Sequence, residues 1–286
     1  MLALLPWFEA NARDLPWRRP ETTPWGVLVS EFMLQQTPVA RVEPVWVQWL
    51  ARWPTPSALA GASRADVLRA WGKLGYPRRA LRLHEAAAAI ASEHGDVVPS
   101  DVAALEALPG IGSYTARAVA AFGYGQRCPV VDTNVRRVVA RAVHGAAEPG
   151  PARTAADLAE VEALLPPPPD AALFSAALME LGAVICTAKA PRCGRCPLRA
   201  DCAWQLAGRP VYTGAMRAPQ AFAGTDRQVR GRLLDVLRDA PGPVSRSALD
   251  AAWADDVQRD RCVASLLVDG LAVQLGADRF ALPGEA

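Results

Sequence analysis

Four of the six cysteines lie between positions 186 and 202, and their spacing is typical of a metal centre. They are separated by six, two and five residues, in the order Cys186, Cys193, Cys196 and Cys202. Thiolates are soft ligands for iron and zinc, and the pair two residues apart can bind one centre. Zinc is the main alternative, although zinc ribbons usually carry two such close pairs. Two disulfides are a third interpretation, which suits a reducing compartment poorly.

Two carboxylic acids are candidates for acid–base chemistry. Glu31 lies in the apolar segment 27–34, where loss of hydration would raise its pKa and let it hold a proton near neutral pH. A solvated position beside Ser30 is the alternative. Asp132 precedes a helix expected to begin near Asn134, so it is either a helix N-cap or a fixed anion. One acid that donates a proton and one that stays ionised are what glycosidic bond cleavage requires.

A glycine-rich turn separates two expected helices at residues 102–108 and 113–122. It consists of Leu108, Pro109, Gly110, Ile111 and Gly112. Glycines let a backbone approach a ligand closely, and the N–H groups at the start of the next helix favour an anion such as a DNA phosphate. A turn without a ligand is the alternative. Tyr114 follows directly and is either a packing aromatic or a cleft residue.

The elements that must position these side chains are mostly helices. Ala, Leu, Val and Arg recur at spacings of three and four residues through position 182, and no run of alternating strands appears. A capping box at Ser63 predicts a helix through Trp71, and Pro77 marks the start of another through Ser92. Further helices are expected at 134–143, 154–165 and 171–182.

The length of 286 residues favours two domains, or one large helical domain with an appendage. We expect a domain over residues 1–210 that includes the cysteine loop 186–202, a linker over 211–226, and a small module over 227–286. In the module, helical patterns at 227–240, 247–253 and 257–269 precede a hairpin at 271–282. This order predicts a winged-helix-like module, and a few helices packed on the main body are the alternative.

Composition narrows the class of protein. Hydrophobic residues make up 51% of the chain, which excludes a disordered or fibrous protein. The 31 basic and 29 acidic residues give a net charge of only +2, so any nucleic-acid-binding surface must be local. No segment is long and apolar enough to span a membrane, and no secretory leader is seen. We expect a cytoplasmic, monomeric protein without a membrane partner.

Taken together, these segments resemble the helix-hairpin-helix DNA glycosylases with an iron–sulfur loop, and among them the MutY-type adenine glycosylases. The resemblance spans residues 7–209. It rests on LPWR (15–18), SEFMLQQT (30–37), LGY (74–76), LPGIG (108–112), VDTNVRRV (131–138) and the four cysteines. It implies removal of adenine paired with 8-oxoguanine or guanine in double-stranded DNA, after the base is flipped out of the duplex. Association with the nucleoid follows from that substrate.

The resemblance also implies roles for individual residues. Glu31 would protonate adenine at N7 and assist the attack of water, and Asp132 would stabilise the oxocarbenium ion or a covalent intermediate. Tyr114 would be an active-site tyrosine, and Asn134 would hold the reacting groups. The residues expected to bind DNA are Gln36, Thr37, Leu74, Tyr76, Pro109, Gly110, Ile111 and Gly112, and the first four match positions that contact the opposing damaged base or wedge beside it. The four cysteines would bind one [4Fe-4S] cluster that shapes a DNA-binding loop and performs no redox catalysis.

Two features of the sequence argue against the lyase activity that some related glycosylases have. Lyase chemistry needs an amine, whereas the hairpin carries Tyr114 and the only lysines are Lys73 and Lys189. This predicts a monofunctional enzyme. A thymine-mismatch glycosylase and a non-catalytic iron–sulfur DNA-binding regulator are the alternatives.

The chain also departs from the family pattern. Residues 227–286 show no NUDIX-like domain of the kind that helps MutY-type enzymes recognise 8-oxoguanine. Thr133 stands where the family usually has glycine.

Overall fold

The computed structural model describes residues 3–214 and 222–285. Residues 215–221, which belong to the expected linker, lie outside this part. The described chain is mostly helical, as the sequence predicts, and its contacts divide it into two compact units. The first unit contains residues 1–31, 99–107 and 111–216, and the second contains residues 32–98, 108–110 and 217–286. This division cuts across the expected domain of residues 1–210, whose independent folding stays a prediction.

The first unit consists of helices and of the loop that carries the cysteines. Its elements are α1 (Leu4–Asn11), η1 (Pro16–Arg18), most of α2 (Pro24–Leu34), α7 (Val102–Ala107), α8 (Ser113–Tyr124), α9 (Thr133–Ala142), α10 (Thr154–Leu164), α11 (Asp170–Val184), η3 (Cys193–Arg195) and α12 (Ala203–Leu206). The helices expected near 113–122, 134–143, 154–165 and 171–182 are thus confirmed within a few residues. None of the helices in the described ranges combines the length and apolar composition that a bilayer span requires.

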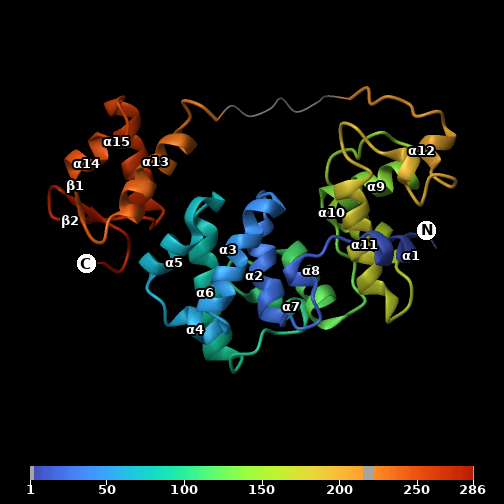
Figure 1. Cartoon of the computed structure of the whole chain (residues 1–286), viewed down its shortest axis with the longest axis horizontal. Helices are drawn as coiled ribbons and strands as arrows, with labels where there is room; N and C mark the ends of the chain where they lie inside the picture. Colours follow the sequence, from blue (N-terminus) through green and yellow to red (C-terminus); the bar gives the residue numbers. More distant parts are fainter. Residues whose placement is uncertain (1–2, 215–221, 286) are drawn as a thin grey trace. The chain divides into compact units, whose positions relative to one another are not determined.

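One hydrophobic core joins the two ends of the first unit. Leu4 and Phe8 of α1 are buried in the same cluster as Val138 of α9 and Phe174 of α11. Figure 1 shows α11 between α9 and α1, and contacts join α11 to both helices. The approach of α11 to α9 requires a glycine, because a Cβ at Gly182 would lie 2.7 Å from the Cβ of Asn134. The residues that follow Asp132 are therefore held against α11.

The second unit combines a helical part with the C-terminal module. Its helical elements are the end of α2, α3 (Val39–Arg52), α4 (Pro56–Ala60), α5 (Arg64–Trp71), η2 (Gly72–Leu74) and α6 (Arg78–Glu93). The expected capping box begins α5, since the Ser63 hydroxyl accepts a hydrogen bond from the Asp66 amide at 3.0 Å. The helix expected after Pro77 is α6.

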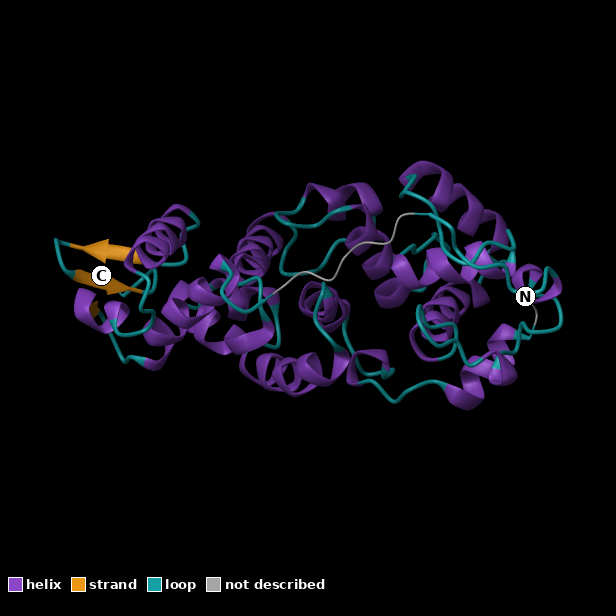
Figure 2. Cartoon of the chain, turned by 90° about the horizontal axis from the view of Figure 1, so that it is seen from above, coloured by secondary structure: helices purple, strands orange, loops and turns teal. Residues whose placement is uncertain are grey.

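The C-terminal module has the topology of a winged helix. Its elements are α13 (Asp226–Asp239), β1 (Val244–Ser245), α14 (Arg246–Asp250), α15 (Asp256–Val268), β2 (Val273–Leu275) and β3 (Arg279–Ala281). The sheet is antiparallel in the order β1-β3-β2, and β2 and β3 are drawn as orange arrows in Figure 2. Three helices and a terminal hairpin confirm the expected order of elements. The short strand β1 was not expected, because two residues carry no periodic pattern.

Candidate active site

Glu31 is buried in the first unit, on the apolar helix α2. Only 6% of the residue is exposed, and Ser30 beside it is 1% exposed, so the solvated position considered for Glu31 is wrong. Burial raises the pKa of Glu31 from 4.5 to about 7, and the nearby charge of Asp132 raises it further. A hydrogen bond from Tyr114 and the charge of Arg18 act in the opposite direction. Glu31 can therefore carry a proton near neutral pH.

Tyr114 connects the helix after the hairpin to Glu31. It lies in the first turn of α8, and its hydroxyl donates a hydrogen bond to the Glu31 carboxylate. Burial, with the charges of Glu31 and Asp132, raises the pKa of Tyr114 well above its ordinary value. Tyr114 therefore stays a neutral donor at physiological pH. Tyr114 is thus buried against Glu31, and its role as a cleft residue stays a prediction.

Asp132 is the N-cap of α9, and its pKa is raised on balance. Its Oδ1 accepts a hydrogen bond from the Val135 amide at 2.7 Å, and its Oδ2 accepts one from the Asn134 side-chain amide at 2.7 Å. Burial raises the pKa of Asp132, while these donors and the charge of Arg137 lower it. Because both carboxylate oxygens have donors, the negative charge is held in one orientation beside Glu31 and Tyr114.

Arg137 links the Asp132 cap to the loop that carries the cysteines. Its Nη2 donates to the Asn134 Oδ1 and to the Gly182 carbonyl, both at 2.8 Å, and its Nε donates to the Cys186 carbonyl at 2.7 Å. Arg137 was not among the site residues expected from the sequence. A usable signal was its position three residues after Asn134, which places both side chains on one face of a helix.

The first unit also contains a buried network of ion pairs around Glu180, which was not predicted from the sequence. Glu180 of α11 has a fully buried side chain, and its Oε1 lies 2.6 Å from the Arg13 Nε. Its Oε2 accepts from the Arg18 Nη2 at 2.9 Å. Burial alone would raise the pKa of Glu180, but the hydrogen bonds and charges of Arg13 and Arg18 outweigh it and hold the pKa below its usual range. The buried Arg18 Nη1 has no partner among the described residues.

The expected DNA-binding turns of the second unit are joined by Arg79. Its Nη2 donates to the Thr37 hydroxyl at 3.0 Å and to the Gly75 carbonyl at 3.1 Å. Thr37 in turn donates to the Leu74 carbonyl at 3.1 Å. Thr37 and Leu74 are about 5% exposed, so they support the turns from inside. Burial lowers the pKa of Arg79 to about 10, so it stays charged.

Gln36 and Tyr76 are the exposed side chains of these two turns. Tyr76 is 44% exposed. Both residues have positive φ angles, 56° for Gln36 and 47° for Tyr76. Such backbone is uncommon outside glycine and often marks a functional position.

The hairpin has the backbone that its glycines predict. Gly110 has φ +76°, and a Cβ there would lie 2.7 Å from the Cβ of Arg82, so only glycine fits. Gly112 is the N-cap of α8 and provides no capping side chain. Gly112 therefore leaves the first N–H groups of α8 without a side-chain cap, and N–H groups at a helix start favour an anion such as a phosphate. Pro109 is half-buried and Ile111 is buried, so both serve packing more than contact.

The four clustered cysteines lie on one loop of the first unit and interact electrostatically. Burial raises the pKa of Cys196 to about 11, and the charges of Cys186, Cys202 and Cys193 raise it further. The Arg141 Nη1 lies 3.5 Å from the Cys186 Sγ and donates to the Thr187 carbonyl at 2.8 Å. Within the described ranges, no three His, Cys, Asp or Glu side chains converge as they would around a single metal ion.

Basic side chains surround the cysteines on the surface. Lys189, Arg192, Arg195 and Arg199 are all exposed. Among the ion pairs of the described residues, none involves these four cations. They are therefore available to an anionic partner.

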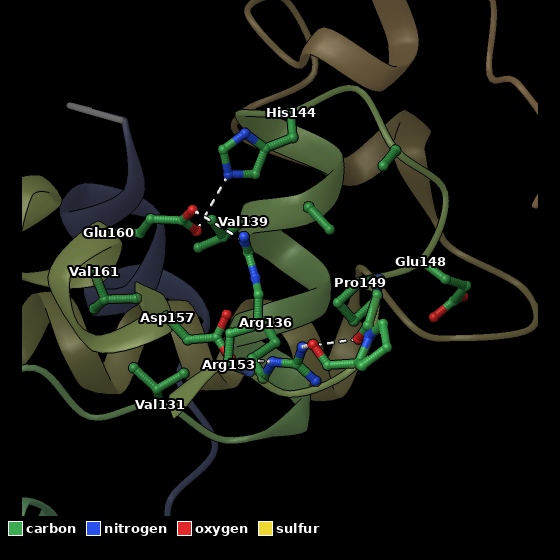
Figure 3. Close-up of a pocket in the computed structure, with 14 residues that line it drawn as sticks. Val131, Arg136, Val139, His144, Glu148, Pro149, Arg153, Asp157, Glu160 and Val161 are labelled. Carbon is green, nitrogen blue, oxygen red and sulfur yellow. Dashed lines mark hydrogen bonds and ion pairs between the residues drawn. The ribbon is translucent and has the colours of Figure 1, made fainter. Parts of the chain in front are cut away.

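A pocket of about 250 Å³ lies apart from Glu31, between α9, α10 and the loop that follows α9. Figure 3 shows Arg136 beside Asp157 and His144 beside Glu160, whereas Glu148 lies apart from these pairs. The Arg136 Nε lies 2.8 Å from an Asp157 carboxylate oxygen, and the His144 Nε2 lies 3.2 Å from a Glu160 oxygen. Arg136 also donates to the carbonyls of Gly150 and Pro151, both at 2.9 Å, and so holds the loop against the helices.

The raised pKa of Glu31 makes stability depend on pH. Between pH 4.5 and about 7 the folded protein keeps a proton that the unfolded chain has lost, so stability falls as pH rises. A shift of this size corresponds to about 3 kcal/mol. We therefore expect Glu31→Gln to melt at a higher temperature than the wild type at pH 8, and at a similar temperature at pH 4.5. A melting difference that does not grow with pH, measured by calorimetry against Glu9→Gln on the surface, would contradict the buried titration.

Known proteins resemble this chain in sequence. A model of the HhH-GPD superfamily base excision DNA repair proteins matches residues 29–163. The chain is 64% identical over 283 residues to an adenine DNA glycosylase of Mycobacterium tuberculosis (strain CDC 1551 / Oshkosh), covering 99% of this chain and 93% of that protein. It is 65% identical to the adenine DNA glycosylase of Mycolicibacterium smegmatis, covering 99% and 95%. The human adenine DNA glycosylase is 39% identical over 208 residues, which cover 70% of this chain and 38% of that protein.

Solved structures share the fold. A thermostable thymine-DNA glycosylase matches with a TM-score of 0.65 and 24% identity, covering 72% of this chain and 94% of that chain. A trapped endonuclease III–DNA covalent intermediate matches with a TM-score of 0.61 and 20% identity, with coverage of 72% and 94%. These likenesses support the helix-hairpin-helix glycosylase fold.

Proposed function

We propose that this chain, which belongs to the adenine DNA glycosylases of the HhH-GPD superfamily of base excision DNA repair proteins, releases adenine paired with 8-oxoguanine or guanine. The enzyme is a hydrolase of N-glycosyl bonds and acts on DNA. The observation that carries the proposed chemistry is the placement of Glu31, Tyr114 and Asp132 together in the first unit. One acid there holds a proton near pH 7, and the other is a fixed anion.

Glu31 is the general acid in this proposal. Its proton goes to adenine N7, the bond between adenine N9 and the sugar C1′ breaks, and the electron pair leaves with the neutral base. The Glu31 carboxylate then accepts a proton from the water that adds to C1′. Tyr114 donates a hydrogen bond to that carboxylate throughout. Duplex DNA reaches this geometry only after the adenine is flipped out.

Asp132 stabilises the positive charge that develops on the sugar. Asn134 and the Val135 amide hold its carboxylate, and Arg137 fixes Asn134 in turn. A charge that is placed before the reaction needs no reorganisation during it. The hydrolysis is monofunctional in this proposal, because Lys73 pairs with Asp235 in the second unit and Lys189 lies on the cysteine loop.

The cysteine loop is proposed to hold a [4Fe-4S] cluster through Cys186, Cys193, Cys196 and Cys202. Four soft thiols on one segment, with the Arg141 guanidinium beside Cys186, suit an anionic iron–sulfur cluster. Bound there, the cluster would fix the loop structurally. The exposed cations of the loop, and the open N-terminus of α8, would then contact DNA phosphates. Iron and acid-labile sulfide analysis of the purified chain distinguishes this cluster from zinc.

Base release from four matched duplexes tests the proposed function. They carry adenine opposite 8-oxoguanine, adenine opposite guanine, thymine opposite guanine, and adenine opposite thymine. We expect adenine release from the first two alone, with strand breaks only after alkali treatment. Release of thymine, or breaks without alkali, would contradict the substrate or the monofunctional reaction. Size-exclusion chromatography tests the proposed monomer, and imaging of the tagged protein tests its proposed place at the nucleoid in the cytoplasm.

A further inference from the structure

The C-terminal module has a winged-helix topology, but its charges do not suit phosphate binding through α15. Residues 222–285 contain eight arginines against nine aspartates and one glutamate, a net charge of −2. Three of these acids, Asp255, Asp256 and Asp260, lie at or near the N-terminus of α15. In a DNA-binding winged helix this helix would enter the groove, where carboxylates are repelled by phosphates. The module must contribute to function by another surface.

The module is docked on α5 by two arginines that donate to each other's helices. The Arg238 Nε of α13 donates to the Leu68 carbonyl at 3.0 Å. The Arg69 Nη2 of α5 donates to the Ala240 carbonyl, just beyond α13, at 2.9 Å. Each cation thus neutralises the carbonyl-rich end of the other helix. The Arg238 side chain is only 10% exposed, so this is a packed interface.

This docking brings the first turn of α13 to Tyr76. The Arg227 Nη1 lies 3.4 Å from the Tyr76 hydroxyl, which accepts its hydrogen bond. The Arg227 guanidinium also lies 5.1 Å from the centre of the Phe222 ring. Nearby, Arg78 pairs with Asp269 of the module at 3.2 Å. The turn that carries Tyr76 is therefore held by both parts of the second unit.

Tyr76, Arg227 and Phe222 form an exposed aromatic–arginine surface. Tyr76 and Phe222 are 44% and 54% exposed, and Arg227 is exposed as well. In the described residues no carboxylate pairs with Arg227, whereas Arg230 and Arg261 of the same module each pair with an aspartate. Aromatic rings and arginine planes stack on nucleic-acid bases of any sequence. The positive φ of Tyr76 orients this surface.

We propose that Arg227 and Phe222 are DNA-binding residues that, together with Tyr76, stack against the base opposite the excised adenine. This inference rests on the proposed function, since it assigns a contact to the same substrate. In this chain the C-terminal module contacts the opposite base through the start of α13 and not through its α15. The contribution of Arg227 and Phe222 to this surface also explains why part-buried hydrogen bonds fix the module to α5.

Equilibrium binding of the full-length protein to two duplexes tests this contact. Both contain a 2′-fluorinated adenosine analogue whose glycosidic bond resists cleavage. One places guanine opposite the analogue, and the other places an abasic site there. We expect Arg227→Ala and Phe222→Ala each to weaken binding of the guanine duplex by about 10-fold and to change binding of the abasic duplex little, because stacking is lost only where a base exists. Arg227→Lys should resemble Arg227→Ala, since the lysine keeps the charge and loses the plane.

Arg232→Ala is the matched control, because it removes an exposed arginine of α13 that has no ion pair among the described residues. If all variants bound both duplexes as the wild type does, Arg227 and Phe222 would serve only the packing of the module, and the proposal would be wrong. Equal weakening on both duplexes, or full rescue by lysine, would mean a phosphate contact and would overturn the proposed base contact. Wild-type protein that releases no adenine would instead refute the proposed function. Melting temperatures of all variants identify any loss of folding.

Discussion

Replacing Glu31 by glutamine is expected to slow single-turnover adenine release by about 10²–10⁴-fold, which is the usual contribution of a general acid. Glutamine keeps the size of the side chain and can accept the Tyr114 hydrogen bond, but it has no acidic proton. Duplex binding should survive, because the proposed phosphate contacts lie on the cysteine loop and at the start of α8, and the buried Glu31 takes no part in them. The variant should fold, since it removes a buried group that titrates.

The pH dependence of the same reaction separates an acid from a merely buried residue. The pKa of Glu31 is about 7, so the protonated fraction falls as pH rises through neutrality. The wild-type rate at saturating enzyme should then fall by about tenfold per pH unit above pH 8. The residual rate of base release by Glu31→Gln should not fall with pH in this range. Glu9→Gln, the same change at an exposed position, provides the control, and rapid excision by Glu31→Gln would remove Glu31 from the mechanism.

Asp132→Asn has the second largest expected effect, a loss of about 100-fold or more in the rate of base release. Asparagine is as good an N-cap as aspartate, so α9 should keep its stability while the negative charge is lost. The variant therefore separates the two roles that the structure combines at this position. A melting temperature near that of the wild type, with a slow rate, would support the fixed anion.

Asp101→Asn is the matched control for this substitution. Asp101 Oδ1 accepts a hydrogen bond from the Ala104 amide at 2.9 Å at the start of α7, and its side chain is exposed. It therefore undergoes the same chemical change at a cap without a proposed catalytic role. A rate for Asp132→Asn equal to that of this control would leave Asp132 as a cap only.

Local sequence was sufficient for features that depend on neighbouring residues. Ser63 and Asp66 predicted the start of α5, and the glycines of the hairpin predicted a turn. The apolar context of Glu31 offered burial as one of two interpretations, and the structure shows that it is buried. The winged-helix order of the module could also be read from its periodicity. In each case the relevant contacts lie within a few residues along the chain, where spacing carries the information.

The features that were missed depend on contacts between distant segments. Arg18 and Glu180 meet across 162 residues, and Arg79 reaches Thr37 across 42. Nothing in the neighbourhood of either arginine indicates its partner. The burial of Thr37 was also not predicted, because a threonine in a turn is usually exposed. The docking of α13 on α5 could not be foreseen, since it uses arginines that look like solvent-exposed charges.

The core that joins α1 to α11 determines when the enzyme can become active during synthesis. The core around Leu4 and Phe8 is complete only when Phe174 and its neighbours have been translated, and Arg13 pairs with Glu180, which lies 167 residues further along the chain. Such a high contact order slows folding, because the long intervening loop must close before its contacts are gained. A nascent chain that ends before α11 therefore exposes an apolar N-terminal helix. The ribosome must release most of the first unit before the two acids can be brought together.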